Sequence, residues 1–339
     1  MQNLKSAIFP LSMTVEREQW RLREPFKITG CIMEELEVVL VRLEDGDGNV
    51  GYGEAAGVDY LPDGSLHSVI RQLEQVRSQV EAGLDLERLQ SLLPPGGARN
   101  ALDCALWDLL SRRSGSAVWQ LAGLSAPHPL LTTYTIGASD PQSMADRARG
   151  FSAARAIKLK LLGEAADLER VRAVRAQRPD VWLGVDANQG CSRSHFQALL
   201  PTLMKERVSL IEQPFKVGDE PPLAELECPI PIAADESIQN LADMHRLRGR
   251  FDVVNIKLDK CGGLTEALAM ARQAPSMGYS VMVGNMVGTS LAMAPAFVVG
   301  QLCQVVDLDG PILLLGDRAQ RAEYRDGRIS CGREVWGGG

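Results

Sequence analysis

The sequence predicts a barrel of parallel β-strands that is preceded by a smaller α+β domain. Two observations support this prediction. Between residues 155 and 260, short apolar segments rich in valine and isoleucine alternate with longer segments of helical spacing, and each apolar segment ends near an ionisable residue. Repeated strand–helix units of this kind form a parallel sheet, and so many in succession favour closure into a barrel. The five segments are Ala156–Lys160, Val181–Asp186, Val208–Pro214, Ile230–Glu236 and Phe251–Lys257.

The first part of the chain predicts antiparallel strands followed by helices. Residues 37–43 are rich in β-branched valine, and the Asp- and Gly-rich turn at 45–49 predicts a hairpin with a return strand at 50–54. We expect loops at 23–30 and 55–64. Residues 65–124 have a helical pattern, with a well-buried helix at 98–112.

Pro127-His128-Pro129 marks the predicted boundary between the two domains. The first barrel strand is then expected at 131–137 and its helix at 141–154. Two later strands are expected at 280–284 and 303–309, and a hairpin turn at 325–329. We therefore predict an α+β capping domain at 1–125, which the tail 316–339 completes, and a barrel domain at 126–315.

Composition and charge exclude several classes of protein. The chain has 339 residues, of which 45% are apolar and 23% charged, with a formal net charge of −7 and no basic run, which argues against nucleic acid or an anionic membrane as a partner. No apolar stretch reaches the roughly 18 residues of a spanning helix, and the first residues lack the apolar core of a signal peptide. Seven cysteines without a Cys-x-x-Cys pair predict reduced thiols and a cytoplasmic location.

Three carboxylates end three successive predicted strands: Asp186, Glu212 and Asp235. The carboxyl ends of barrel strands meet at one face, so these acids converge and would repel one another, with raised pKa values, unless a cation offsets them. An oxygen-only ligand set without Cys or His favours Mg²⁺ over Zn²⁺, and we expect one Mg²⁺ per subunit. The alternative is that these acids cap helices or form salt bridges.

Two lysines on one strand, Lys158 and Lys160, point to the same face, which in a barrel is the interior. Adjacent ammonium groups depress each other's pKa, which would suit Lys160 to act as a base with Lys158 assisting. Lys257 ends a strand on the opposite side of the three carboxylates. The competing candidate, Lys260, is expected in the loop that follows, and salt bridges to the carboxylates are the alternative role for the lysines.

These motifs resemble the muconate-lactonizing-enzyme subgroup of the enolase superfamily over nearly the whole chain. The resemblance rests on the helix Ala98–Leu109 and on the barrel motifs Lys158-x-Lys160, Asp186-x-Asn188, Glu212-Gln213-Pro214, Asp235-Glu236-Ser237 and Asn255-Ile256-Lys257 with Gly262-Gly263. It implies an α/β fold, a modified (β/α)₇β TIM barrel under an α+β cap, with Mg²⁺ on the three carboxylates and Lys160 and Lys257 as acid and base groups.

Asp307-Leu308-Asp309 resembles the Asp-x-Asp motif of dipeptide epimerases of the L-Ala-D/L-Glu type, which implies contact with the α-ammonium group of a dipeptide. Two anions at the mouth suit a free amino terminus and disfavour a dianionic substrate. The alternative for both acids is helix capping. The loop after Pro25-Phe26 lacks the arginine that Ala-Glu epimerases generally carry, so Ile32 and Met33, together with Met286, are the candidate contacts to a hydrophobic substrate side chain. Nearby acids, Glu34 and Glu35 among them, leave a cationic side chain open.

The leading hypothesis is therefore a Mg²⁺-dependent dipeptide epimerase, expected as a homo-oligomer. An o-succinylbenzoate synthase or a muconate-type cycloisomerase is the enzymatic alternative, because both share the metal and lysine motifs. A barrel that binds a small molecule without catalysis is the alternative from another class, although both lysines and all three carboxylates are present.

Overall fold

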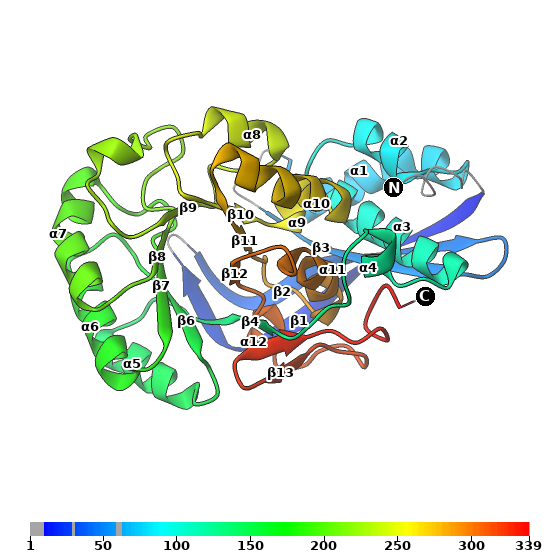
Figure 1. Ribbon diagram of the computed structural model, residues 1–339. Helices are drawn as coiled ribbons and strands as arrows, with labels where there is room; N and C mark the ends of the chain where they lie inside the picture. The colour runs from blue at the N-terminus through cyan, green and yellow to red at the C-terminus, as the bar shows by residue number, and fades with distance from the viewer. Residues whose placement is uncertain (1–9, 29–30, 59–62, 339) are drawn as a thin grey trace.

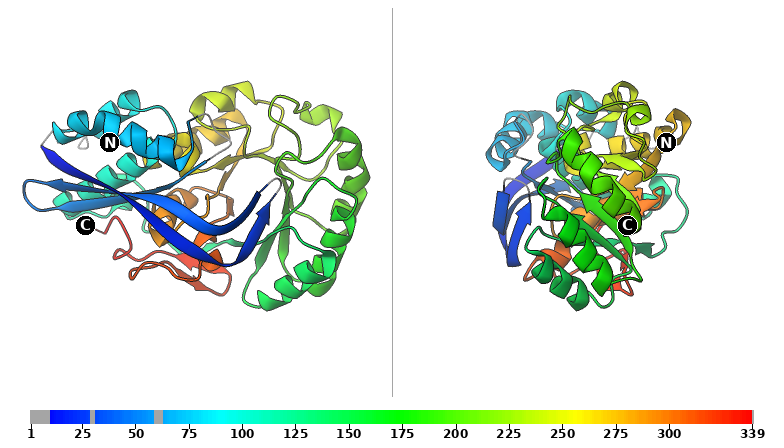
Figure 2. Two further views of the ribbon diagram at one scale, coloured as in Figure 1. Left: turned by 180° about the vertical axis from the view of Figure 1, so that it is seen from behind. Right: turned by 90° about the vertical axis from the view of Figure 1, so that its left-hand side faces the viewer.

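The computed structural model describes residues 10–28, 31–58 and 63–338. The N-terminal part is an antiparallel sheet in the order β1 (Leu11–Ile28), β2 (Cys31–Asp45) and β3 (Val50–Ala56). Helices pack against this sheet, and the ends of its two long strands extend across the barrel (Figures 1 and 2). The helices are α1 (Leu66–Glu81), α2 (Leu86–Leu92), α3 (Gly97–Ser114) and α4 (Val118–Leu121).

The buried helix α3 packs closely on β3. A side chain at Gly51 would meet the backbone of Ala105, and one at Gly53 would meet the backbone of Ala101, so both positions require glycine. The hairpin predicted at 45–49 is present, with the Asp45 carboxylate accepting from the backbone N–H groups of Asp47 and Asn49, each at 2.9 Å. The α+β character predicted for this region is confirmed.

The second part is an eight-stranded parallel sheet in the order β12-β11-β10-β9-β8-β7-β6-β5. Helices α5, α6 and α7 form its outer layer along one side (Figure 1). The strands are β5 (Thr133–Ile136), β6 (Ala156–Lys160), β7 (Trp182–Asp186), β8 (Leu210–Glu212), β9 (Ile232–Ala234), β10 (Val253–Ile256), β11 (Ser280–Val283) and β12 (Val305–Val306). The helices are α5 (Pro141–Gly150), α6 (Asp167–Gln177), α7 (Arg193–Lys205), α8 (Leu241–Arg246), α9 (Leu258–Cys261), α10 (Leu264–Gln273), α11 (Ser290–Gly300) and α12 (Gly310–Leu313), with 3₁₀ turns η1 (Leu223–Glu225) and η2 (Ala274–Met277).

Side chains join the first and last strands of this sheet. The N–H of Leu308 donates to Thr132 Oγ1 at 2.9 Å, and the N–H of Thr135 donates to Asp309 Oδ2 at 2.5 Å. Thr133 donates its hydroxyl to Asp307. The two acids after β12 therefore also hold β5 in place, which links the closing seam of the barrel to its mouth.

Two predicted elements differ clearly from the structure. The loop predicted at 23–30 is wrong for residues 23–28, because β1 continues past Pro25 after an irregularity in its pairing with β2, and Phe26 then pairs with Met33. Residues 29–30 lie outside the described part. The strand predicted at 131–137 is interrupted at Thr132, because β4 (Leu130–Leu131) pairs instead with β14 (Arg328–Ser330), the partner of β13 (Glu323–Arg325).

The C-terminal tail contacts the N-terminal sheet and helix α3. Trp336 Nε1 donates to the carbonyl of Tyr52 at 2.9 Å, and the N–H of Gly337 donates to Asp108 at 2.8 Å. Arg318 pairs with Glu54 at 2.7 Å and with Glu18 at 2.6 Å. These contacts support a tail that completes the cap, while the domain limits at 125 and 315 stay a prediction.

The described residues also bear on membrane spans and on the state of the cysteines. Among them, no helix is long and apolar enough to cross a membrane. The six cysteines whose side chains are described are free thiols: Cys104, Cys191, Cys228, Cys261, Cys303 and Cys331.

The ion pair of Arg318 with Glu54 predicts a large effect on stability. Glu54 is fully buried, and burial raises the pKa of its carboxyl despite the opposing effect of Arg318. Arg318→Ala leaves that carboxylate without its cation, and should lower the free energy of unfolding in urea by about 3 kcal/mol. Arg325→Ala, from the same tail but with a side chain that is 91% exposed, should change it little. Equal effects of the two substitutions would contradict this role.

Candidate active site

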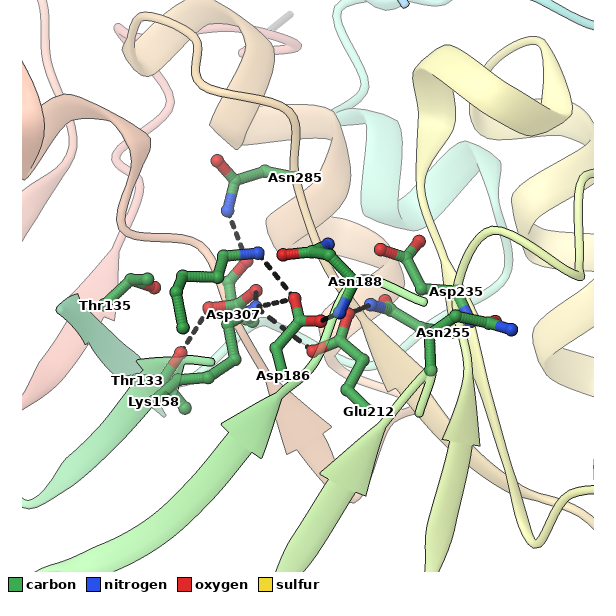
Figure 3. Close-up of polar contacts among 12 residues, drawn as sticks. Thr133, Thr135, Lys158, Asp186, Asn188, Glu212, Asp235, Asn255, Asn285 and Asp307 are labelled. Atoms are coloured by element: carbon green, nitrogen blue, oxygen red, sulfur yellow. Dashed lines mark hydrogen bonds and ion pairs between the residues drawn. The ribbon is translucent and has the colours of Figure 1, made fainter. Parts of the chain in front are cut away.

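The three predicted carboxylates meet at the mouth of the barrel (Figure 3). Asp186 and Glu212 are register neighbours at the ends of β7 and β8, and Asp235 directly follows β9. All three side chains are buried, and one oxygen from each lies within 4.8 Å of the others. The expectation that the strand ends bring these acids together is confirmed.

Neighbouring amides fix the direction of the carboxylates. The N–H of Asn188 donates to Asp186 Oδ1 at 2.9 Å, and Asn255 Nδ2, from β10, donates to Glu212 Oε1 at 2.7 Å. The side-chain oxygen of Gln213 accepts from the N–H groups of Asp235 and Ser237 at 2.9 and 3.1 Å, which ties the turn after β8 to the turn after β9.

Each of the three predicted lysines is paired with one of these acids or with Asp307. Lys158 Nζ lies 3.2 Å from Glu212 Oε2 and 3.9 Å from Asp186, and it also binds Asp307. Lys160 Nζ lies 2.5 Å from Asp186 Oδ2. Lys257 Nζ lies 2.7 Å from Asp235 Oδ2. The structure therefore brings the amines to the carboxylates from both sides, and both interpretations, acid–base groups and salt bridges, are compatible with these pairs.

The charged groups around Lys158 contradict the prediction for its pKa. The pKa of Lys158 was predicted to fall beside Lys160. Burial does favour the neutral amine, but Asp307, Glu212 and Asp186 outweigh it and hold the pKa of Lys158 well above its usual value. A group that stays protonated cannot be a base near neutral pH, so Lys158 is suited to carry fixed positive charge.

The pKa values of Glu212 and Asp235 shift in opposite directions. Burial, reinforced by Asp186, raises the pKa of Glu212 to about 8. The pKa of Asp235 is lowered, because Lys257 and Lys260 outweigh its burial. The expected rise is therefore present at Glu212 and wrong for Asp235, which has two ammonium neighbours.

A second correction concerns Lys260. It was expected in a loop, but it lies in the single turn α9 and is buried, with Nζ 2.6 Å from Asp235 Oδ1. It is absent from the residues that line the cavity, whereas Lys158, Lys160 and Lys257 line it. This position separates Lys260 from the other three lysines.

A cavity of about 640 Å³ opens above these groups, between the barrel and the cap. Asp307 and Asp309 line one side of it. All three candidate contacts to a substrate side chain, Ile32, Met33 and Met286, also lie in its wall. The only arginine of the described lining, Arg17, binds Glu37.

Asp307 and Asp309 have distinct surroundings. Asp307 binds both Lys158 and Thr133, and Asn285 donates to its backbone carbonyl. Asp309 accepts from the N–H of Thr135, and burial together with Asp307 raises its pKa to about 6. Helix capping, the alternative for these acids, is not what the side chains do here: α12 begins after Asp309 without a side-chain cap.

Four residues of the site were not predicted from the sequence to be site residues: Thr133, Thr135, Asn255 and Glu236. Glu236 is buried, and burial together with Asp235 raises its pKa to about 7. The alternating pattern of each strand contains the signal for Thr133, Thr135 and Asn255, since residues two apart share the interior face. Their partners lie on other strands, so sequence spacing alone does not reveal the contacts.

The residues present fit a hard divalent cation. The donor set consists of oxygen atoms, which suits Mg²⁺. Beside it, Asn188 Oδ1 and Glu236 Oε2 are buried without a hydrogen-bond partner among the described residues, and a metal-bound water would satisfy such acceptors. Asp186, Glu212 and Asp235 would hold the ion.

A capped parallel barrel with three carboxylates and paired lysines defines an enolase-type fold and site. The family models agree: residues 11–123 match the mandelate racemase / muconate lactonizing enzyme N-terminal domain, and residues 143–331 match the enolase C-terminal domain-like family. The chain belongs to the mandelate racemase / muconate lactonizing enzyme family of the enolase superfamily.

One known relative and two solved structures illustrate which proteins the chain is similar to. The chain is 38% identical over 320 residues to the L-Ala-D/L-Glu epimerase of Escherichia coli K12, covering 94% of this chain and 99% of the relative. A crystal structure of an enolase family member from Agrobacterium tumefaciens with homology to dipeptide epimerases, with bound sodium and L-Ala-L-Glu, matches with a TM-score of 0.93 and 39% identity, over 97% of this chain and 100% of the other. The dipeptide epimerase of Enterococcus faecalis V583, complexed with Mg and L-Leu-L-Tyr, matches with a TM-score of 0.88 and 26% identity, over 96% and 98%.

The carboxylate cluster predicts metal-dependent stability. A ligand at 100 times its dissociation constant stabilises the folded state by about 2.7 kcal/mol, so Mg²⁺ should raise the melting temperature and EDTA should reverse the rise. Asp235→Asn should weaken Mg²⁺ binding by about tenfold or more, because it removes one anionic ligand. The exposed Asp219→Asn is the matched control. An unchanged Mg²⁺ titration in Asp235→Asn would contradict the assignment.

Proposed function

We propose that the protein is a Mg²⁺-dependent dipeptide epimerase, an isomerase that inverts the α-carbon next to the C-terminal carboxylate of a dipeptide. The observation that carries the proposal is the pair Lys160 and Lys257. Lys160 ends β6 and Lys257 follows β10, with β7, β8 and β9 between them, and both line one cavity at the three carboxylates. Two amines on opposite sides of a bound α-carbon can remove its proton from one face and return a proton to the other.

The chain's own residues supply the proton transfers. For one epimer, Lys160 in its neutral form accepts the α-proton and Lys257 in its charged form donates one on the opposite face. For the other epimer the roles exchange. Mg²⁺, when bound, would hold the substrate carboxylate and stabilise the negative charge that develops on it. Lys158, whose pKa is held high by Asp307, Glu212 and Asp186, adds positive charge to the same site.

The amino end of the substrate is assigned to the acids after β12. Both Asp307 and Asp309 line the cavity. Asp307 is already bound by Lys158 and Thr133, whereas Asp309 is bound by the N–H of Thr135. A free α-ammonium group adds the positive charge that these two adjacent carboxylates favour. A dianionic succinylbenzoate or muconate skeleton would meet repulsion here, which disfavours the synthase and cycloisomerase alternatives.

The substrate side chain is assigned to the cap side of the cavity. Ile32, whose side chain is largely exposed, and Met33 lie on β2, and Met286 lies after β11. These apolar groups would contact a hydrophobic side chain, and Glu34 and Glu35 in the same lining would favour a cationic one. Neither set offers a partner for a carboxylate side chain.

The two-lysine arrangement predicts stereospecific exchange. Lys257→Ala should still exchange the α-proton of one stereoisomer with D₂O, through Lys160, while Lys160→Ala should exchange only the other isomer. Neither variant should epimerise efficiently, because the proton cannot return on the opposite face. Proton NMR of each pure isomer in D₂O with Mg²⁺ measures both rates. If both single variants exchange both isomers, the two-base mechanism fails.

The position of Asp309 predicts selectivity for a free amino group. Asp309→Asn should raise KM for dipeptides about tenfold, since a charged hydrogen bond contributes about 1.5–3 kcal/mol, and should spare N-acylated analogues. The pKa of Asp309 is raised to about 6, so below that pH the group is neutral and KM should rise as the pH falls. The Asn variant should lose this pH dependence. Asp326→Asn, at an exposed turn, is the control. Equal losses for both substrate types would exclude an ammonium role.

A further inference from the structure

The single turn α9 places two lysines on one carboxylate. Lys257 precedes the turn and Lys260 lies within it, and the N–H of Lys260 donates to the carbonyl of Lys257 at 3.0 Å. The turn ends at Gly262, whose φ of 83° permits the chain to reverse at once. Lys257 then binds Asp235 Oδ2, and Lys260 binds Asp235 Oδ1.

Every hydrogen of the Lys260 ammonium group has a protein acceptor. Lys260 Nζ donates to Asp235 Oδ1 at 2.6 Å, to the backbone carbonyl of Asp235 at 2.5 Å and to that of Asn255 at 3.3 Å. An ammonium group has three N–H donors, and three acceptors surround this one. The side chain is 1% exposed and does not reach the cavity, so no hydrogen is directed at a substrate.

These contacts extend to a second acid of the cluster. By binding both the side chain and the backbone oxygen of Asp235, one ammonium group restricts the rotation of that carboxylate. By binding the backbone of Asn255 it also connects β9 to β10, and the Asn255 side chain donates to Glu212 at 2.7 Å (Figure 3). Lys260 therefore supports Asp235 directly and Glu212 through one intervening residue.

We propose that Lys260 is a positioning residue that fixes the orientation of the metal-binding carboxylates Asp235 and Glu212, and that it takes no part in proton transfer. The proposal rests on the proposed function, because it requires that the three carboxylates bind Mg²⁺. It gives different roles to two lysines that lie three residues apart: Lys257 transfers a proton to or from the substrate, and Lys260 orients the metal-binding carboxylates.

Removing the ammonium group of Lys260 would change the Mg²⁺ affinity in opposite directions for a positioning role and for a purely electrostatic role. Removing a positive charge close to the cluster would, by itself, strengthen the attraction for a cation. Releasing Asp235 and Asn255 from their common donor would instead leave the ligands free to turn away and weaken binding. The sign of the change in Mg²⁺ affinity therefore distinguishes the two roles.

The test is Lys260→Met, a substitution that keeps the length of an unbranched side chain and removes the ammonium group. Mg²⁺ binding is measured by isothermal titration calorimetry on the metal-free protein, and by the rise in melting temperature with Mg²⁺. We expect the dissociation constant to increase about tenfold or more relative to wild type. Lys205→Met removes the same charge at an exposed position, the last residue of α7, and should bind Mg²⁺ as wild type does.

Isotope exchange supplies the second measurement. At saturating Mg²⁺, Lys260→Met should exchange the α-protons of both stereoisomers with D₂O and keep most of its kcat. If Lys260 were a base, this variant would lose the exchange of one isomer, as is expected of Lys257→Ala. Should Lys260→Met not fold without metal, Lys260→Ala, which also removes every donor, serves for both measurements.

Four outcomes are distinct. Weaker Mg²⁺ binding with exchange of both isomers supports the proposal. Tighter or unchanged Mg²⁺ binding overturns it, and loss of one isomer's exchange at saturating Mg²⁺ also overturns it. If wild-type protein itself binds no Mg²⁺, the proposed function fails together with this inference, and that result is recognised from the wild-type titration alone.

Discussion

The pairing of ammonium and carboxylate groups at the barrel mouth is the constraint on which the rest of the site depends. Asp186, Glu212, Asp235 and Asp307 are buried there, and buried charges are tolerated only when they are paired and hydrogen-bonded. Lys158, Lys160, Lys257 and Lys260 supply those partners. The described chain therefore joins four buried lysines and four buried acids in one network, and Asp309 and Glu236 are two further buried acids of the same cavity.

This pairing also connects the chemistry to the fold. Lys158 bridges the metal-binding acids and Asp307, which itself binds Thr133 on the first barrel strand. The seam of the barrel and the centre of the site are thus joined through one ammonium group. On the cap side, Glu54 binds Thr289 and Arg318, so the segment that carries Met286 is fixed to the N-terminal sheet by a second buried carboxylate.

Much of this arrangement follows from the sequence, and the remainder depends on contacts between distant segments. The strand pattern located Asp186, Glu212 and Asp235 because each strand end carries its acid to the same face. The same reasoning failed for the pKa of Lys158, because Asp307 is 149 residues away and only barrel closure brings it near. It also placed Lys260 in a loop, since an apolar pattern does not reveal the one-turn helix that Gly262 terminates. Residues 23–28 were predicted to form a loop, but pairing of β1 with β2 resumes at Phe26.

The central claim is that the site removes and returns the proton next to the C-terminal carboxylate of a dipeptide. Incubation of the wild-type protein with a mixed dipeptide library in D₂O and Mg²⁺, followed by mass spectrometry and chiral analysis, tests it most directly. The account predicts one deuterium at the α-carbon of the C-terminal residue, with inversion at that carbon, and neither change after EDTA treatment. Absence of deuterium from every dipeptide, or deuterium at the N-terminal residue instead, would contradict it.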